Sequence, residues 1–323
     1  MRRMHLPTGH PHALAQRGSA TLTAMIVMVL STMILSGLIW QQHLAMRQLE
    51  YQRDRRQAEW LHVAATDFAR FILAENSKTT SAEDSLTEAW AIPLNNTKVS
   101  DFLRGVDIPQ ELSHLTMMGQ VTDAQGRFNL NNLVDQETGR RIDPDGLMTF
   151  QNLLTNLGAD RSLGNQVANT LVQTGIRFTD PGQLDGFEGF TPMLRQRLRP
   201  LLTALPERTN INANTASSDV LRAAFQGMSA SQAANFITER TRMPIKTVAE
   251  LKTRLANLGV NSAGDPRMVD VKTMFFIART EVRFPESIYV GESIIQRSTP
   301  GAMSYNRSLT QIVSTRFFST INE

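Results

Sequence analysis

The stretch SATLTAMIVMVLSTMILSGLIW, at residues 19–40, contains no charged residue and is mostly apolar. As a helix that rises about 1.5 Å per residue, it is long enough to cross the roughly 30 Å hydrocarbon core of a bilayer. A secretory signal has a shorter apolar region of about 7–15 residues that ends at a small-residue cleavage site. This stretch instead runs into Trp40, Gln41 and Gln42. The sequence therefore predicts a transmembrane helix at 19–40 that stays on the mature chain.

The residues before the apolar stretch are polar and basic. Arg17 and Gly18 directly precede Ser19, and Arg47 and Arg53 follow the span, so charge on both sides leaves its orientation open. A polar leader, a basic residue, a glycine and an immediate apolar run together resemble the class III leader of type IV pilins and type II secretion pseudopilins. A membrane peptidase cuts such leaders after the glycine, on the cytoplasmic side. The resemblance implies a leader at 1–18, cleavage between Gly18 and Ser19, and an apolar helix that remains in the membrane.

The fifth residue counted from Ser19 is Thr23. Most pilins and pseudopilins carry glutamate at this position, and the resemblance implies that such a carboxylate neutralises the terminal amine of a neighbouring subunit. A lone carboxylate in lipid costs roughly 2.5–3.5 kcal/mol, so it is expected only where it has a partner. A threonine can satisfy its hydroxyl on the carbonyl one turn earlier. Thr23 therefore fits either a subunit with no neighbour above it or an ordinary polar residue that a membrane helix tolerates.

Apolar residues at three- and four-residue steps continue beyond Trp40 and predict a long amphipathic helix that ends near Glu75 and Asn76. Further along, MMGQVTDAQGRFNLNNL (117–133) predicts a β-hairpin that turns at 123–126, with Phe128 and Leu130 on a buried face and asparagines on a wet one. Residues 41–144 are therefore expected to hold this helix and the first strands of a sheet. The apolar stripe of the helix, which needs a partner, includes Leu44, Leu49, Trp60, Leu61, Phe68 and Phe71.

Residues 145–266 change to helical periodicity. Two short helices are predicted around 150–157 and 167–172, joined through Gly158, and a second, weaker copy follows around 220–225 and 233–237. The copies look alike in QVANTLV (166–172) and QAANFIT (232–238), and the paired repeats resemble helix-hairpin-helix modules. Thr215 or Ser217 is the expected N-cap of the helix that opens the second copy.

Period-two alternation returns at 269–277, 288–294 and 309–317, with breaks at Pro285 and Pro300. Residues 267–323 are therefore expected to be antiparallel strands that complete the sheet begun earlier. The predicted fold class is α+β. A pilin-like long N-terminal helix packs on an antiparallel sheet, and a large all-helical insertion with two helix-hairpin-helix-like repeats interrupts that sheet.

The whole chain resembles the K-type minor pseudopilins of type II secretion systems, the general secretion pathway protein K family. The likeness rests on this architecture, on DAQGRFNLNNL (123–133) and LRPLLTALPERTNINANTASSDVLRA (198–223), and on the missing glutamate at Thr23. It implies a minor pseudopilin at the tip of the pseudopilus, which nucleates or caps assembly for export of folded proteins across the outer membrane. It also implies the I- and J-type minor pseudopilins and the prepilin peptidase as partners, N-terminal methylation, and a single-pass inner-membrane anchor with the globular part in the periplasm.

The same resemblance implies an acidic loop between the helical repeats that is implicated in calcium binding. Asp180, Asp185 and Glu188 stand in the corresponding stretch, but their spacing does not match a calcium loop, in which oxygen ligands alternate along a tight turn. Surface acids are the favoured interpretation. We therefore expect no metal ligands and no cofactor, with calcium as the alternative.

The composition argues against an enzyme. The chain has 323 residues, a net charge of +3 and no cysteine, which excludes disulfides, cysteine nucleophiles and thiolate metal sites. No P-loop, Gly-x-Ser-x-Gly, His-Glu-x-x-His or dinucleotide fingerprint is present. The histidines beyond the leader, His43, His62 and His114, are isolated along the sequence. No catalytic residues are predicted.

Binding of DNA by the paired repeats would need a Gly-x-Gly hairpin and a basic face. Gly158 and Gly227 each stand alone, and residues 145–265 hold twelve Lys and Arg against ten Asp and Glu, so no nucleic acid partner is expected. Two alternative functions stay open, a type IV pilus minor pilin and a membrane-tethered DNA-binding protein. A local basic patch for the latter would be formed by Arg195, Arg197, Arg199, Arg240 and Arg242.

Overall fold

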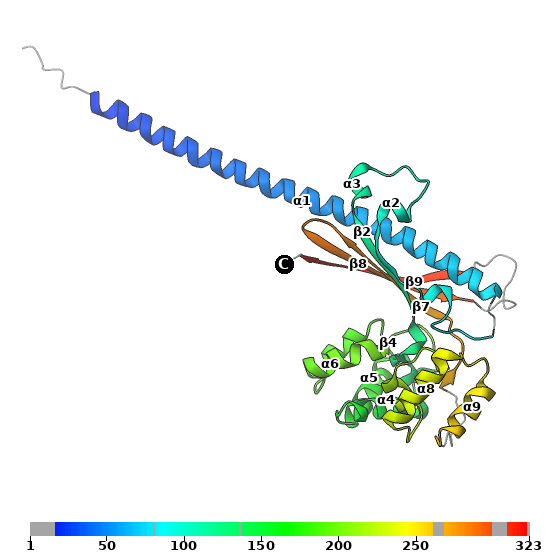
Figure 1. Cartoon of the computed structure of the whole chain (residues 1–323). Coiled ribbons are helices and arrows are strands. Elements are labelled where there is room, and N and C mark those ends of the chain that lie inside the picture. Colours follow the sequence, from blue (N-terminus) through cyan, green and yellow to red (C-terminus); the bar gives the residue numbers. More distant parts are fainter. Residues whose placement is uncertain (1–16, 80–81, 136, 261–267, 299–308, 322–323) are drawn as a thin grey trace, which may run out of the picture. The chain divides into compact units, whose positions relative to one another are not determined.

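The structure is a computed structural model that describes residues 17–79, 82–135, 137–260, 268–298 and 309–321 (Figure 1). The chain forms two compact units, residues 1–57 and residues 58–323. Helix α1 (Arg17–Thr79) provides the described part of the first unit and, from Ala58 onward, the first element of the second. It ends close to the predicted end at Glu75 and Asn76.

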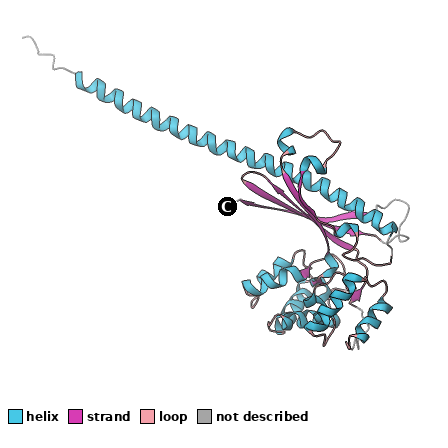
Figure 2. Ribbon diagram, viewed as in Figure 1, coloured by secondary structure: helices cyan, strands magenta, loops and turns pink. Residues whose placement is uncertain are grey.

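A five-stranded antiparallel sheet lies at the centre of the second unit (Figure 2). The order of strands across it is β1-β2-β7-β8-β9, so β2 and β7 are neighbours although they lie far apart in the sequence. The last three strands confirm the predicted C-terminal antiparallel run. The strands are β1 (Leu94–Lys98), β2 (Thr116–Asp123), β7 (Phe275–Arg283), β8 (Ser287–Arg297) and β9 (Thr310–Ile321).

Residues 58–79 of α1 cover one face of this sheet. Ala58, Leu61, Ala69 and Leu73 are buried, at spacings that place them on one side of a helix. They pack on two groups of sheet residues, so the predicted packing of a pilin-like helix on an antiparallel sheet is confirmed. Short elements that join the helix to the sheet are η1 (Ala89–Ala91), α2 (Val99–Phe102) and α3 (Gln110–Ser113).

The chain between β2 and β7 folds into a helical layer with its own hydrophobic core, which confirms the predicted helical insertion in the sheet (Figure 1). Its helices are α4 (Pro144–Asn156), α5 (Ser162–Thr174), α6 (Pro192–Leu198), α7 (Ser218–Ala224), α8 (Ala230–Arg242) and α9 (Val248–Asn257). Its 3₁₀ turns are η2 (Ala124–Gly126), η3 (Leu130–Leu133), η4 (Pro181–Gly186) and η5 (Arg199–Leu201). Two short parallel pairs join β3 (Phe128–Asn129) to β4 (Leu202–Thr203) and β5 (Ile211–Asn212) to β6 (Val269–Asp270).

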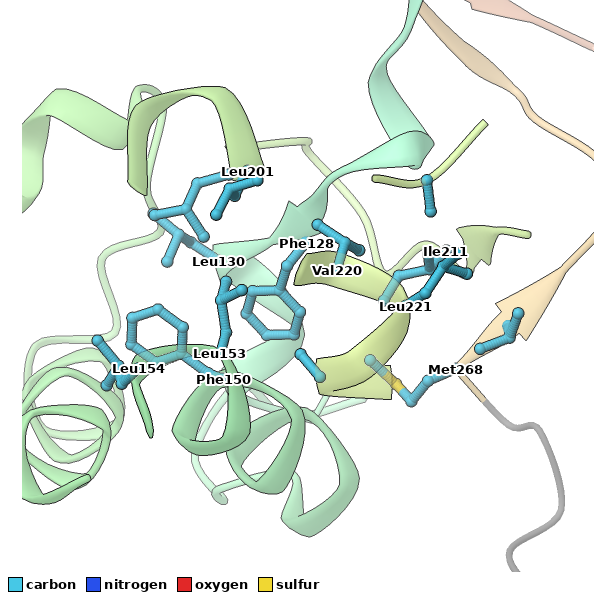
Figure 3. Packing of buried hydrophobic residues seen from close by; sticks show 14 of the residues in the cluster. Phe128, Leu130, Phe150, Leu153, Leu154, Leu201, Ile211, Val220, Leu221 and Met268 are labelled. Carbon is cyan, nitrogen blue, oxygen red and sulfur yellow. The ribbon is translucent and has the colours of Figure 1, made fainter. Parts of the chain in front are cut away.

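The core of the helical layer is centred on stacked aromatic rings (Figure 3). The rings of Phe128 and Phe150 lie 5.6 Å apart between centroids and are nearly parallel, at 9°. Helix α4 approaches η3 so closely that a Cβ on Gly146 would lie 1.9 Å from the carbonyl oxygen of Asn132, so only glycine fits there. Residues 128–134 thus belong to the core of the helical layer, although they precede the expected start of the insertion at 145.

The predicted hairpin at 117–133 is wrong. Strand β2 ends at Asp123, whose side chain accepts a hydrogen bond from the Gln125 amide and starts the 3₁₀ turn η2. The next strand, β3, pairs with β4 of the helical layer and not with β2. Phe128 and Asn129 are both buried, so the alternation of apolar and polar residues does not correspond to one buried and one solvent-exposed face here.

The helix starts in the insertion follow the sequence signals. Asp143 caps α4 by accepting a hydrogen bond from the Gly146 amide at 2.8 Å, and Ser217 caps α7 by accepting one from Val220. Of the two caps considered for α7, Ser217 is therefore the one used. Gly158 and Gly227 take left-handed backbone angles after α4 and α7, which lets each helix stop before its successor begins.

Candidate functional site

The N-terminal part of α1 presents a continuous apolar surface between residues 20 and 40. Three of its hydroxyl groups are satisfied within the helix: Thr23 donates to the Ala20 carbonyl at 3.0 Å, Ser31 to Val27 at 2.7 Å and Thr32 to Met28 at 2.9 Å. In lipid, polar groups must find such internal partners. Within the described residues, α1 is the helix that is long and apolar enough to cross a membrane, and it fits a single-pass anchor joined to a globular unit.

Gly18 and Ser19 lie in the first turn of α1, which begins at Arg17. The rest of the leader, residues 1–16, lies outside the described residues, and cleavage after Gly18 stays a prediction. Thr23 makes the local hydrogen bond expected of an uncharged residue in a membrane helix. Whether its neutrality reflects a subunit with no neighbour above it also stays a prediction.

The predicted apolar stripe divides between two faces of α1. In the second unit Trp60, Phe68 and Phe71 are 75%, 52% and 62% exposed, whereas Leu61 is 3% exposed and packs in the core beneath the sheet. Leu61 lies about 100° around the helix from Trp60, so these two adjacent residues lie on different faces of α1. The prediction that Leu61 contacts a partner is therefore wrong.

The exposed side of α1 in the second unit is apolar. We call Trp60, Val63, Phe68 and Phe71 the outer face of α1; sequence periodicity did not single out Val63, which is 46% exposed. A run of large exposed apolar side chains on a soluble surface marks an interaction site. In the first unit, the two remaining stripe residues Leu44 and Leu49 are also exposed, at 54% and 61%.

A buried histidine fixes α1 on the sheet. The ring nitrogens of His62 lie 2.5 Å from the Thr280 hydroxyl and 2.8 Å from that of Ser293. The ring also packs edge-on against Phe317, and a Cβ on Gly291 would lie 2.5 Å from it, so β8 needs glycine there. Burial lowers the pKa of His62 to about 4, so the ring is neutral at physiological pH. The sequence shows His62 only as an isolated histidine and does not reveal this role.

A buried carboxylate joins the sheet to the helical layer. Asp123, at the end of β2, accepts hydrogen bonds from Asn212 at 2.8 Å, from Thr215 at 2.6 Å and from Thr273 at 2.5 Å. Burial raises the pKa of Asp123, and these donors oppose that effect. Because Thr273 lies just before β7, this carboxylate ties together the two points where the chain leaves and rejoins the sheet.

Buried asparagines connect segments of the helical layer. Asn131 receives the Phe178 amide at 2.9 Å and donates to the Phe178 and Leu205 carbonyls at 2.9 and 2.8 Å. Asn132 pairs in the same two-way manner with Thr209, and Asn214 with Ile245. Each amide side chain replaces a backbone partner for a strand-like segment. The signal in the sequence was the density of asparagines in NLNN (129–132) and NINAN (210–214).

Two of the three acids considered for calcium, Asp180 and Asp185, form ion pairs with arginines. Asp185 forms an ion pair with Arg195 at 2.8 Å, and Asp180 pairs with Arg316 while its carboxylate also caps η4. Among the described residues there is no group of three or more His, Asp or Glu side chains placed to hold a metal ion.

The arginines considered for a basic patch are largely committed to internal contacts. Arg197 donates to the Leu157 carbonyl at 2.8 Å, and Arg240, which is buried, donates to the carbonyls of Ala213 and Ala216. Burial lowers the pKa of Arg240 to about 10. With Arg195 paired to Asp185, Arg199 and Arg242 are left as the two members that carry no such contact in the described part of the chain.

Comparisons with known proteins agree with one another. Two family models described as type II secretion system (T2SS), protein K, match residues 126–175 and 211–272, both in the helical layer. The type II secretion system protein K of Pseudomonas aeruginosa PAO1 is 27% identical over 318 residues, which cover 88% of this chain and 90% of that protein. Its counterpart in Klebsiella pneumoniae is 23% identical over 315 residues, 87% of this chain and 93% of that protein.

The fold also matches a solved structure. A chain in the crystal structure of the GspK-GspI-GspJ complex from the enterotoxigenic Escherichia coli type 2 secretion system superposes with a TM-score of 0.63 at 19% identity, covering 85% of this chain and 99% of that chain. The sequence matches thus extend over the helical layer, the sheet and α1 together. These matches together support the type II secretion system protein K family, the K-type minor pseudopilins, as the family that this chain resembles.

Proposed function

We propose that this minor pseudopilin occupies the tip of the type II secretion pseudopilus, where it nucleates or caps assembly for the export of folded proteins across the outer membrane. In this proposal the prepilin peptidase cuts between Gly18 and Ser19, and the helix at 19–40 stays in the inner membrane. The globular unit then lies in the periplasm. The proposed role calls for no cofactor, and two of the three acids considered for calcium, Asp180 and Asp185, form ion pairs with arginines.

One observation carries the proposal. The insertion between β2 and β7 is a folded layer with a core of its own, added to the sheet between two neighbouring strands. A subunit with this added bulk is too wide to be stacked beneath another, so it suits the end of a filament. The uncharged Thr23 supports the same position, because a terminal subunit has no amine above it to neutralise.

The expected partners are the I- and J-type minor pseudopilins. Support comes from the fold shared with a chain of the GspK-GspI-GspJ complex and from the outer face of α1, which leaves Trp60 and Phe71 largely exposed. Buried tryptophans often dominate binding at interfaces, with losses of 2 kcal/mol or more on truncation. We assign the outer face of α1 to these contacts.

Co-purification of the full-length, detergent-extracted chain with the I- and J-type pseudopilins tests the proposal. The unchanged chain should retain both partners, and Trp60→Glu should weaken retention by about tenfold or more. Met193→Glu is the matched control, because Met193 is 74% exposed on α6 and the change is chemically similar. A chain that ignores both partners, or equal losses in the two variants, would contradict the assignment.

A deletion in the source organism separates this role from that of a type IV pilus minor pilin. Loss of the gene should stop the secretion of folded enzymes and leave piliation and twitching unchanged. The opposite pattern would assign the chain to a pilus.

A further inference from the structure

A cleft of about 760 Å³ lies between the helical layer and the sheet. On the sheet it is lined by the face opposite α1. Thr280 and Ser293 contact His62 of α1, so the adjacent residues Arg279 and Glu292 point to the other face, because side chains alternate along a strand. The opposing wall comes from η4, α6, η5 and β4.

A row of polar residues, three of them charged, crosses the sheet inside this cleft. Gln120, Arg279, Glu292 and Arg316 are register partners on β2, β7, β8 and β9. Glu292 receives Arg279 at 2.9 Å and Arg316 at 3.2 Å. Arg316 also pairs with Asp180 on the opposing wall, so one guanidinium holds carboxylates from both sides of the cleft.

The cleft carries more positive than negative groups. Its charged lining consists of five arginines and three carboxylates, an excess of two positive charges. All three carboxylates are already paired, Asp180 and Glu292 as described and Asp185 with Arg195. Arg127 and Arg199 make no ion pair or side-chain hydrogen bond within the part of the chain that the structure describes. The excess charge of the cleft therefore resides on these two side chains.

Arg127 is the more informative of the two. It lies between η2 and β3, where the chain leaves the sheet, and it is half-buried. Burial lowers its pKa, while the charges of Glu292 and Asp123 act in the opposite direction without a direct ion pair. A guanidinium has five N–H donors, and burying it without an acceptor is costly. A ligand with a planar anionic group would supply that acceptor.

The rest of the lining indicates what kind of anion fits. Apolar side chains, among them Leu184, Ile277 and Ile294, stand beside the arginines, so the cleft suits a ligand that carries apolar groups together with its anionic ones. Arginine matches a carboxylate through two parallel hydrogen bonds. We propose that this cleft binds an acidic peptide segment, with one carboxylate on Arg127, another on Arg199, and apolar side chains against Ile277 and Ile294. This site does not depend on the position of the chain in a pseudopilus.

Direct binding of a peptide to the full-length chain in detergent micelles tests the site. The probe is a fluorescein-labelled octapeptide of alternating glutamate and leucine, read by fluorescence anisotropy, and the comparison peptide has glutamine in place of glutamate. The glutamate peptide should bind saturably. Arg127→Gln should weaken it by about tenfold or more, since hydrogen bonds to charged groups contribute roughly 1.5–3 kcal/mol. Arg242→Gln, the same change on an exposed arginine outside the cleft, should leave the affinity unchanged.

A second variant keeps the test decisive if Arg127→Gln perturbs folding. Arg199 is exposed, so Arg199→Gln leaves the interior intact and should weaken the glutamate peptide by about threefold, as for an exposed ion pair. Equal binding of the glutamine peptide would overturn the proposal, as would full affinity in both cleft variants. Displacement of the peptide by tripolyphosphate at lower concentration than by free glutamate peptide would assign the cleft to phosphate instead.

Discussion

At the scale of single residues, His62 shows how one buried ring positions a helix on a sheet. Its two nitrogens need one donor and one acceptor, and the hydroxyls of Thr280 and Ser293 can serve as either. These hydroxyls come from different strands, so the ring fixes the rotation of α1 about its own axis. That rotation decides which residues form the outer face of α1, and Trp60, two positions earlier, is left exposed as a result.

The neutral state of His62 predicts a pH-dependent stability. With its pKa near 4 in the folded chain and about 6.5 when unfolded, the unfolded state takes up a proton first as the pH falls. The stabilisation is complete above about pH 6.5 and is lost progressively down to about pH 4, by on the order of 3 kcal/mol. Urea unfolding of the full-length chain between pH 7 and pH 4 measures this loss.

Carboxylates also take up protons between pH 7 and pH 4. Two variants separate the contribution of His62 to the pH-dependent stability from theirs. His62→Gln should be less stable at pH 7 but should lose less further stability on acidification than the unchanged chain. His114→Gln should follow the unchanged chain at every pH, because His114 is exposed on the surface. Parallel curves for His62→Gln and the unchanged chain would rule out the neutral buried ring.

At the scale of elements, the helices could be predicted more fully than the residues that join them. The three- and four-residue spacing of Phe150, Leu153, Leu154 and Leu157 reports burial on one helix face directly, and α4 forms there. At 128–131 the prediction from periodicity was wrong, because alternating apolar and polar residues do not form one buried and one solvent-exposed face there. The asparagines are buried there and bind backbone groups some 47 to 78 positions away, which no local pattern can reveal.

The same limit applied to α1 and to the proposed cleft. Periodicity identified an apolar stripe but could not separate Leu61, which packs on the sheet, from Trp60, which does not. Nothing in the sequence distinguished Arg127. Its place in a cleft depends on the pairing of β2 with β7, which joins the strand before Arg127 to the part of the sheet that carries Glu292 and Arg316.

The hydrogen bonds of the buried asparagines predict that replacing one of them destabilises the helical layer. Asn131→Ala removes the partners of the Phe178 amide and of the Phe178 and Leu205 carbonyls, all in a buried setting. Each unsatisfied buried group costs about 1–3 kcal/mol. Thermal unfolding of the full-length chain, followed by circular dichroism, should show a midpoint lowered by roughly 5–10 °C. Asn235→Ala, at an exposed position on α8, should not lower it. An unchanged midpoint in Asn131→Ala would mean that water replaces the amide.

At the scale of the whole molecule, the order of elements explains why the sheet could be anticipated although its parts are scattered. Strand-like alternation stops near Asp123, helical periodicity replaces it, and alternation resumes before β7, so an insertion is the simplest arrangement. Strand pairing then closes the sheet across the insertion through β2 and β7. The short parallel pairs β3-β4 and β5-β6 could not be anticipated, since two-residue strands leave no periodic signal.

The membrane anchor leads to a prediction about the mature chain. Arg17 and Gly18 sit at the start of α1, and the apolar surface follows at once, so removal of the leader would leave an uncharged helix whose first residue is Ser19. The mass of the chain extracted from membranes should therefore lack residues 1–18 and keep residues 19–40, with a further 14 Da, as is usual for one added methyl group, where the new amine is methylated. Gly18→Leu should leave the leader attached, because it alters the residue after which the peptidase cuts. Gly37→Ala, within the same helix at a site where a Cβ meets no other atom, should be processed normally. A chain that begins at Met1, or one cut beyond Trp40 and released from the membrane, would be incompatible with a retained helical anchor.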